Sequence, residues 1–183
     1  MKTLIRLCTL AALLAALPHG AQADHEVTRW RYGHGAAVSV TFDDGLESHV
    51  TVGAPLLEAR NLRGTFYVLT QDEWNEWPGY WDDWRTLAAA GHEIGSHTLT
   101  HAQLSTLSEA EMRKELLESR DIVDAEITTQ SCLTIAYPYG DYDDLVEDVT
   151  AEYYIAGRTV WSPLYLNFYP GDPYAPMDAF AIG

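Results

Sequence analysis

The sequence has few cysteines and few lysines. Its 183 residues include only Cys8 and Cys132 as thiols, and only Lys2 and Lys114 as lysines. Cys8 lies in a segment that we expect to be removed, so the mature chain would keep one thiol. A single thiol excludes an intrachain disulfide, even in an oxidising compartment. Cys132 stands beside apolar Leu133, and we expect it to be a buried structural thiol.

Positive charge is also sparse. The 11 Lys and Arg residues are outnumbered by 27 Asp and Glu residues, which gives a formal net charge of −16. Loss of Lys2 and Arg6 with the N-terminal segment would change it to −18. Proteins that bind phosphate backbones need clustered Lys and Arg. We therefore expect no nucleic-acid partner.

Long apolar runs are missing as well. The N-terminal run from Leu7 to Leu17 is too short to cross a bilayer comfortably. It follows two basic residues and precedes Ala21-Gln22-Ala23, a small-x-small cleavage signal. We expect residues 1–23 to be a secretory signal peptide and residues 24–183 to be one domain. The domain would be periplasmic or secreted, with no stable membrane insertion; an N-terminal anchor is the alternative reading.

Strand-like and helix-like segments alternate along the rest of the chain. Apolar or β-branched runs, typical of strands, occupy residues 36–42, 64–69, 92–96, 133–137 and the segment starting at 154. Helical patterns occupy residues 46–60, 80–90, 143–153 and a stretch that begins at Ser108. This alternation predicts an α/β fold with a mostly parallel sheet, either a barrel or open.

Polar residues follow several of these strands. Asp43 and Asp44 end the first run, which reads as a buried strand, while His97 and Tyr139 follow later ones. The carboxyl ends of parallel strands meet on one face, so these side chains should gather there. Two carboxylates at such a place are costly to desolvate without a neutralising positive charge.

A pair of histidines could hold that charge. His97 and His101 are four residues apart, and on a helix this spacing places both side chains on one face. With Asp44 they would offer one carboxylate and two imidazoles to a divalent ion. This donor set suits Zn²⁺ or a similar ion such as Co²⁺ better than Mg²⁺.

An aromatic segment lies on the same predicted face. Residues 73–84 hold four of the six tryptophans. Trp81 and Trp84 continue toward Leu87 at helical spacing, which predicts core packing. Trp74 and Trp77 could instead form a stacking platform for sugar rings, or they could pack in the core as well.

Three motifs carry a resemblance to a known family. They are Thr41-Phe42-Asp43-Asp44-Gly45, His97-Thr98-Leu99-Thr100-His101 and Tyr137-Pro138-Tyr139-Gly140. In order and spacing they resemble the first three motifs of the NodB-type polysaccharide deacetylases, the carbohydrate esterase 4 family. The resemblance implies a distorted (β/α)7-type barrel and hydrolytic removal of acetyl groups from a polysaccharide.

The resemblance also implies roles by position. Asp43 would be the general base, and Asp44, His97 and His101 would bind the metal. The backbone N–H of Tyr139 would stabilise the oxyanion. Tyr137 and Pro138 would lie against the substrate, with Pro138 stiffening the loop.

Two features depart from the family pattern. In the family an arginine oriented toward the catalytic acid commonly stands two residues before the proline of the third motif, but here that place is Ala136. The family also places a histidine near its C-terminus as general acid, and no histidine follows His101. The barrel would also lack its last elements. We expect the chain to be C-terminally incomplete; the alternatives are another proton donor or impaired catalysis.

The resulting expectation is a metal-dependent deacetylase acting on an N-acetylhexosamine polymer or on acetylated xylan. A catalytically weak carbohydrate-binding domain that keeps the fold and the metal is the alternative. A glycosidase that uses Asp43 and Asp44 is disfavoured, because adjacent residues cannot easily sit about 5 Å or more apart across one bond. The sequence does not indicate an oligomeric state.

Overall fold

The computed structural model describes residues 38–71, 77 and 79–160, and the account below concerns these residues. From Ser39 onward they belong to one compact unit. The predicted signal peptide, Trp74 and the C-terminal segment from residue 161 lie outside the described residues. Among the helices that are described, none has both the length and the apolar character needed to span a bilayer.

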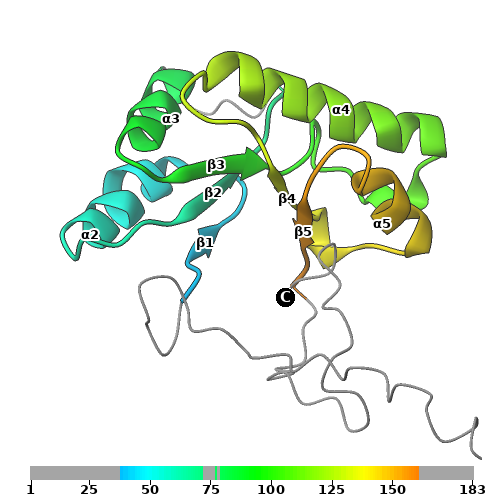
Figure 1. Ribbon diagram of the computed structural model, residues 1–183, viewed down its shortest axis with the longest axis horizontal. Helices are drawn as coiled ribbons and strands as arrows, with labels where there is room; N and C mark the ends of the chain where they lie inside the picture. Colours follow the sequence, from blue (N-terminus) through cyan, green and yellow to red (C-terminus); the bar gives the residue numbers. More distant parts are fainter. Residues whose placement is uncertain (1–37, 72–76, 78, 161–183) are drawn as a thin grey trace, which may run out of the picture. The chain divides into compact units, whose positions relative to one another are not determined.

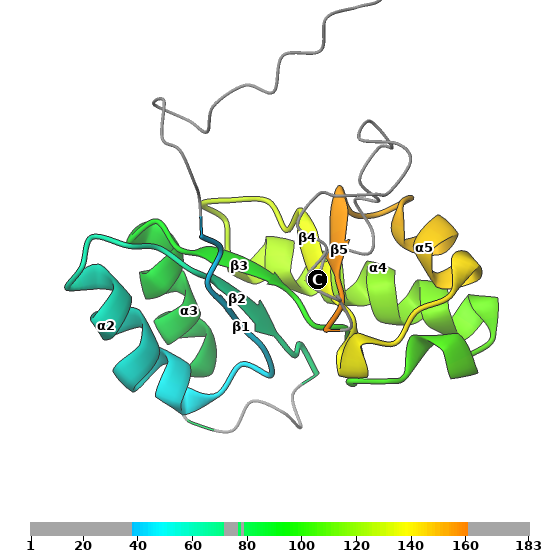
Figure 2. The same ribbon diagram turned by 90° about the horizontal axis from the view of Figure 1, so that it is seen from below.

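The centre of this unit is a five-stranded parallel sheet. Its strands are β1 (Thr41–Phe42), β2 (Thr65–Val68), β3 (Glu93–Ser96), β4 (Thr134–Ala136) and β5 (Ala156–Arg158). They pair in chain order, β1-β2-β3-β4-β5, and every pairing is parallel. The sheet curls into a half-barrel (Figure 2). The predicted α/β class and parallel sheet are confirmed, and five strands of the predicted barrel are present in the described part of the chain.

Helical segments connect the strands. They are η2 (His49–Gly53), α2 (Ala54–Glu58), α3 (Tyr80–Ala89), η4 (Leu104–Thr106), α4 (Glu109–Glu126), η5 (Pro138–Gly140) and α5 (Asp144–Thr150). The helices α2 to α5 lie along the outer side of the curled sheet (Figure 1). Parallel neighbours require such crossover connections, because a tight hairpin can join only antiparallel strands.

The first strand differs from its prediction. Residues 36–42 read as a buried strand, but β1 has only two residues, Thr41 is exposed and Val38 is 86% exposed. Among the described strands β1 pairs only with β2, so it is an edge strand. Phe42 is its partly buried residue, and its ring stacks on Phe66 at a centroid distance of 4.8 Å.

The helix predictions have mixed outcomes. The predicted helix 46–60 divides into the π-helical turn η2 and the short α2, with Pro55 in the first turn of α2. Proline is tolerated there because its fixed φ suits the first turn of a helix. The helix after Ser108 is confirmed as α4. Ser108 caps it, with a reciprocal bond between Ser108 and Glu111.

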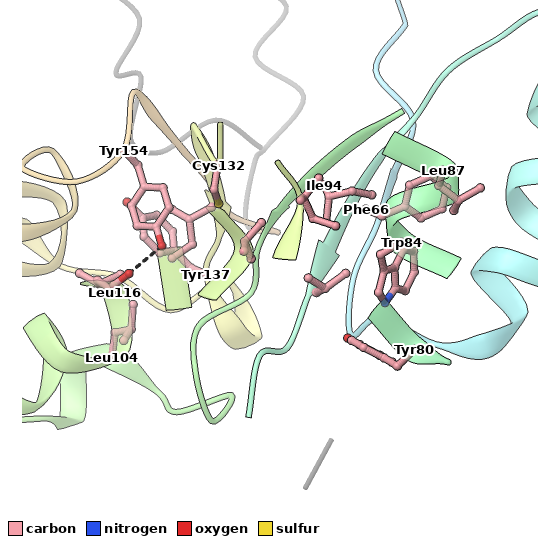
Figure 3. Close-up of a cluster of buried hydrophobic side chains, with 14 of the residues drawn as sticks. Phe66, Tyr80, Trp84, Leu87, Ile94, Leu104, Leu116, Cys132, Tyr137 and Tyr154 are labelled. Carbon is pink, nitrogen blue, oxygen red and sulfur yellow. Dashed lines mark hydrogen bonds between the residues drawn. The ribbon is translucent and has the colours of Figure 1, made fainter. Parts of the chain in front are cut away.

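The core lies between the sheet and these helices. Phe66, Ile94 and Trp84 are fully buried in one part of it, and Leu116 and Tyr154 are buried in another (Figure 3). The core placement predicted for Trp84 is thus confirmed.

The core also buries two polar groups, the Tyr154 hydroxyl and the Cys132 thiol. The Tyr154 hydroxyl donates to the Leu116 carbonyl oxygen at 2.8 Å, so its burial leaves that donor satisfied. Cys132 is 2% exposed, and burial raises the pKa of its thiol. The thiol is therefore unreactive, as expected for a structural cysteine.

The Tyr154 hydrogen bond leads to a stability prediction. Tyr154→Phe removes the buried donor and should lower the free energy of unfolding by about 1 kcal/mol, the usual net contribution of one such bond. Urea denaturation followed by circular dichroism measures the change. Tyr142→Phe, at a ring that is 38% exposed, is the matched control and should leave the midpoint unchanged. Equal midpoints for both variants would contradict the prediction.

Candidate metal centre

The predicted site residues follow the strands that position them. Asp43 and Asp44 come directly after β1, His97 comes directly after β3, and Tyr139 lies in the turn η5 after β4. All these strands are parallel, so their carboxyl ends lie at the same edge of the sheet. The expectation that this edge collects polar groups is confirmed for Asp44 and His97, and His101 lies with them.

These three residues form a compact cluster. One ligand atom from each lies within 4.8 Å of the others. The Nε2 atom of His97 is 3.3 Å from Asp44 Oδ1, and the Nε2 atom of His101 is 3.2 Å from the same oxygen. His97 is buried, His101 is partly buried and Asp44 is exposed. The cluster therefore opens to solvent on the side of the carboxylate.

The backbone of the histidine pair is not helical, and that prediction is wrong. Residues 97–101 form a tight loop after β3, in which Thr98 has a φ of 69° and His101 a φ of 62°. The two imidazole centroids are 4.9 Å apart. The four-residue spacing thus brings the imidazoles together through a reversal of the chain. Left-handed backbone at a residue other than glycine costs on the order of 1 kcal/mol, so this loop needs support.

Glu115 of α4 supplies that support. Its Oε2 accepts hydrogen bonds from the backbone N–H groups of Leu99 at 3.0 Å and Thr100 at 2.9 Å. Its Oε1 accepts from the Thr100 hydroxyl at 2.7 Å. The side chain is buried, and these three donors satisfy its carboxylate. Glu115 therefore holds the segment between the two histidines.

Sequence analysis missed Glu115, although a signal exists. The residue lies on the face of α4 that buries Met112, Leu116 and Ser119. A carboxylate on the buried face of an amphipathic helix is unusual, because burying a charge without partners is costly. Such a position predicts a specific set of donors, but the sequence does not say which ones.

The tautomer of His97 follows from its own partner. Its Nδ1 lies 2.8 Å from the Ala136 carbonyl oxygen on β4. A carbonyl oxygen can only accept, so Nδ1 carries the proton and donates it. The lone pair is then on Nε2, which faces Asp44. This arrangement is typical of histidines that bind metals, whose second nitrogen is fixed by an outer partner.

Electrostatics favour the metal-binding protonation states of Asp44 and His101. The adjacent His97 ring holds the pKa of the Asp44 carboxyl below its ordinary value, against the opposing effect of burial. Burial lowers the pKa of His101, and neighbouring His97 lowers it further. At neutral pH Asp44 is therefore ionised and His101 is neutral, the forms that can coordinate a cation.

The donor set fits a divalent ion. One carboxylate and two imidazoles converge, and a neutral nitrogen lone pair and an ionised oxygen are the chemistry that Zn²⁺ and its neighbours accept. Their ligand atoms are already gathered within 4.8 Å. Asp44, His97 and His101 would hold the ion.

Asp43 has a different partner from its neighbour. Its Oδ1 accepts a hydrogen bond from Nη2 of Arg158, the last residue of β5. Asp44 faces the imidazoles instead. The two adjacent carboxylates thus take separate partners. β1 ends at Phe42 and Asp44 has a φ of 70°, so a turn of the backbone directs them apart. Sequence analysis missed Arg158, because it gave the last strand only a start, near residue 154, whereas β5 ends at Arg158.

Gly45 allows the chain to turn after the two acids. Its φ is 63°, in the left-handed region, and a Cβ atom there would lie 2.5 Å from the Tyr80 hydroxyl oxygen. The same hydroxyl donates to the Leu69 carbonyl oxygen at 3.0 Å. Glycine is required at this position both by the turn and by the close approach of Tyr80.

The residues of the third motif differ in solvent exposure. Tyr137 is 1% exposed and Pro138 is buried, whereas Tyr139 is 61% exposed. The ring of Tyr139 lies 4.6 Å from that of His101, centroid to centroid. The prediction that Tyr137 lies against the substrate needs correction for its side chain, because the ring is in the core, at a centroid distance of 5.9 Å from Tyr142.

Trp77 has both structural contacts and partial exposure. Its indole N–H donates to Asp83 at 2.8 Å. Its ring lies 4.8 Å from Tyr80 and 6.0 Å from Trp84. It packs against the core while remaining half-buried. Its predicted role in sugar stacking stays a prediction.

Comparison with known proteins identifies relatives of this chain. The family model described as polysaccharide deacetylase matches residues 31–156. A gellan lyase of a Bacillus species is 37% identical over 136 residues, which are 74% of this chain and 5% of that protein. The chitooligosaccharide deacetylase of Sinorhizobium fredii is 30% identical over 136 residues, 71% of this chain and 60% of that enzyme.

A solved structure shares the fold. The deacetylase PplD of Streptococcus pyogenes, in complex with acetate, superposes with a TM-score of 0.63 at 26% identity. The match covers 67% of this chain and 55% of PplD. The chain thus spans less than two thirds of the length of each of these relatives.

The cluster predicts metal binding that depends on each ligand and on pH. Calorimetric titration with Zn²⁺ should give one ion per chain. Asp44→Ala or His101→Ala should weaken binding by more than about 100-fold, which exceeds the loss typical when a residue that hydrogen-bonds to a metal ligand is replaced. Acidification should also weaken binding, because protons compete for the imidazoles. The lowered pKa of His101 confines this competition to acidic pH. Asp121→Asn, a surface acid on α4, is the control, and equal affinity in all variants would exclude this site.

The loop support can be tested separately. Glu115→Gln keeps the shape of the side chain but loses the carboxylate that accepts three bonds, so Zn²⁺ affinity should fall by about 10- to 100-fold. Calorimetry again measures it. Glu118→Gln, at an exposed position on the same helix, is the matched control. Unchanged affinity in Glu115→Gln would show that the loop holds its shape without this carboxylate.

Proposed function

Because the chain belongs to the polysaccharide deacetylase family, we propose that it hydrolyses acetyl groups from a polysaccharide with the help of a bound divalent ion, most simply Zn²⁺. The observation that carries this proposal is the convergence of Asp44, His97 and His101 beside a second carboxylate, Asp43, that is not part of the cluster. One acid is thus available to hold the ion and the other to move a proton.

An ion held by the cluster would act as a Lewis acid toward the acetyl carbonyl and would lower the pKa of a nearby water. Asp43 then acts as general base. Its Oδ1 is engaged by Arg158, so Oδ2 takes the proton as water attacks the carbonyl carbon. When the bond to the sugar breaks, protonated Asp43 can return this proton to the leaving nitrogen or oxygen. The products are acetate and a free amine or hydroxyl.

The oxyanion formed on the acetyl carbon needs a fixed donor, and we propose the backbone N–H of Tyr139 for this role. Tyr139 has a φ of 61° inside the turn η5, and Pro138 precedes it with a restricted φ. A backbone donor in a rigid turn costs little reorganisation when the charge develops. The short ring distance from His101 places this turn beside the metal ligands.

The substrate contacts are proposed from exposure. Tyr139 offers a largely exposed ring next to the cluster, and Trp77 offers a half-buried ring on the segment after β2. Aromatic faces suit the apolar faces of sugar rings. Pro138 shapes the turn and Tyr137 supports it from the core. Trp74 would add to the platform.

The polymer would be an N-acetylhexosamine glycan or acetylated xylan. The name of the Sinorhizobium fredii relative, a chitooligosaccharide deacetylase, favours the N-acetylated class. A periplasmic or secreted location, proposed from residues 1–23, would bring the protein to such polymers.

Acetate release tests the function. The zinc-loaded protein should release acetate from a chitin tetramer or from acetylated xylan, and activity should vanish with EDTA and return with Zn²⁺. Asp43→Asn should lower kcat by about 10²- to 10⁴-fold, the contribution of a positioned base, while zinc affinity is kept. Asp121→Asn, a surface acid on α4, is the matched control.

Two results would contradict the proposal. Acetate release that continues after complete metal removal would exclude the metal-assisted reaction. Glycan binding without acetate release by the loaded protein would instead support the alternative, a carbohydrate-binding domain that keeps the deacetylase fold.

A further inference from the structure

We propose that Arg158 is the positioning residue for the Asp43 carboxylate, and that it acts from β5 in place of the arginine that is absent at Ala136. This inference rests on the proposed function, because it concerns the group assigned there as general base. It adds a residue to the site that none of the three motifs contains.

The contact itself joins distant parts of the chain. Arg158 Nη2 donates to Asp43 Oδ1 across 115 positions of sequence. The side chain of Arg158 is 17% exposed and that of Asp43 is 29% exposed. The pair is therefore shielded from most of the solvent that weakens surface ion pairs. A guanidinium–carboxylate hydrogen bond is also directional, because the guanidinium is planar.

A second contact restricts Arg158. Its guanidinium carbon lies 5.4 Å from the centroid of the Tyr67 ring on β2, a distance suited to cation–π attraction. Tyr67 is itself 6% exposed. Arg158 is thus held by the Tyr67 ring on β2 while it reaches Asp43, which follows β1. The side chain has little freedom to leave Asp43.

The register of the sheet explains how Arg158 can reach. Ala136 on β4 is paired with Arg158 on β5, so both side chains leave the same face of the sheet. Tyr67 pairs with Gly95 on β3, and a Cβ at Gly95 would lie 2.7 Å from the Tyr67 ring. Small residues thus stand next to both side chains, Gly95 beside Tyr67 and Ala136 beside Arg158, which leaves room for the ring and the long side chain.

The consequence is a fixed carboxylate plane. With Oδ1 held by Arg158, the position of Oδ2 is determined by the rigid carboxylate group. Asp44, by contrast, faces the two imidazoles. An arginine at position 136 on β4 would leave the same face of the sheet as Arg158, because the two positions are paired. Arg158 reaches Asp43 from β5, which is one strand farther from β1 than β4 is.

Kinetics and zinc binding test the proposal on the full chain. Arg158→Ala should lower kcat by about 10²-fold, the usual loss from misplacing a catalytic group. KM and Zn²⁺ affinity should stay within about threefold, because Arg158 pairs with Asp43, which is not one of the three cluster residues. Arg158→Lys keeps the charge and should recover part of the lost kcat. Arg113→Ala, which breaks an arginine–carboxylate pair with Glu152, is the matched control and should keep kcat.

Three outcomes would overturn the inference: kcat of Arg158→Ala close to that of the wild type, zinc affinity that falls in parallel with kcat, or Arg158→Lys no better than Arg158→Ala. The second outcome would make Arg158 a support of the metal cluster, and the third would make it a packing residue.

A double-mutant cycle separates this inference from the proposed function. Asp43→Ala and Arg158→Ala, alone and together, are compared by urea unfolding, and the pair should show a coupling of at least about threefold in the unfolding equilibrium constant. A wild-type protein that binds zinc but releases no acetate would contradict the proposed function, while the cycle would still test the interaction between Arg158 and Asp43. Absence of coupling would contradict the positioning role of Arg158 even if the wild type is an active deacetylase.

Discussion

The meeting of Asp44 with His97 and His101 is the contact on which the site depends. It requires an acid after β1 and a reversed loop after β3 to reach one point, and parallel pairing through β2 brings these ends together. The loop adopts left-handed backbone at Thr98 and His101. That conformation persists because surrounding groups hold it, as strained segments at functional sites require.

The supporting groups come from elements outside the motifs. Glu115 on α4 binds the N–H groups between the histidines, and the Ala136 carbonyl on β4 orients His97. Arg158 on β5 engages Asp43. Each partner acts through a hydrogen bond that sets a direction as well as a distance. The curled sheet and the helix outside it thus serve as the frame that positions the three cluster residues and the neighbouring acid.

Much of the fold could be predicted from periodicity and helix caps. The alternation of strands and helices predicted the parallel sheet, and Ser108 with Glu111 predicted the start of α4, because both signals are local. Predictions failed where distant residues decide. The first strand is an exposed edge because of what pairs with it. The histidine pair lies in a loop, since spacing alone cannot separate a helical turn from a reversal.

The sequence by itself determined the residue types of the site and their order, because metal ligation and proton transfer restrict which side chains can serve. It therefore identified Asp43, Asp44, His97 and His101 before any geometry was known. Only the tertiary structure decided that the two acids have different partners, that Glu115 braces the loop and that Arg158 lies against Asp43. Those contacts join residues up to 115 positions apart, and such pairings depend on strand register and packing, which no local pattern records.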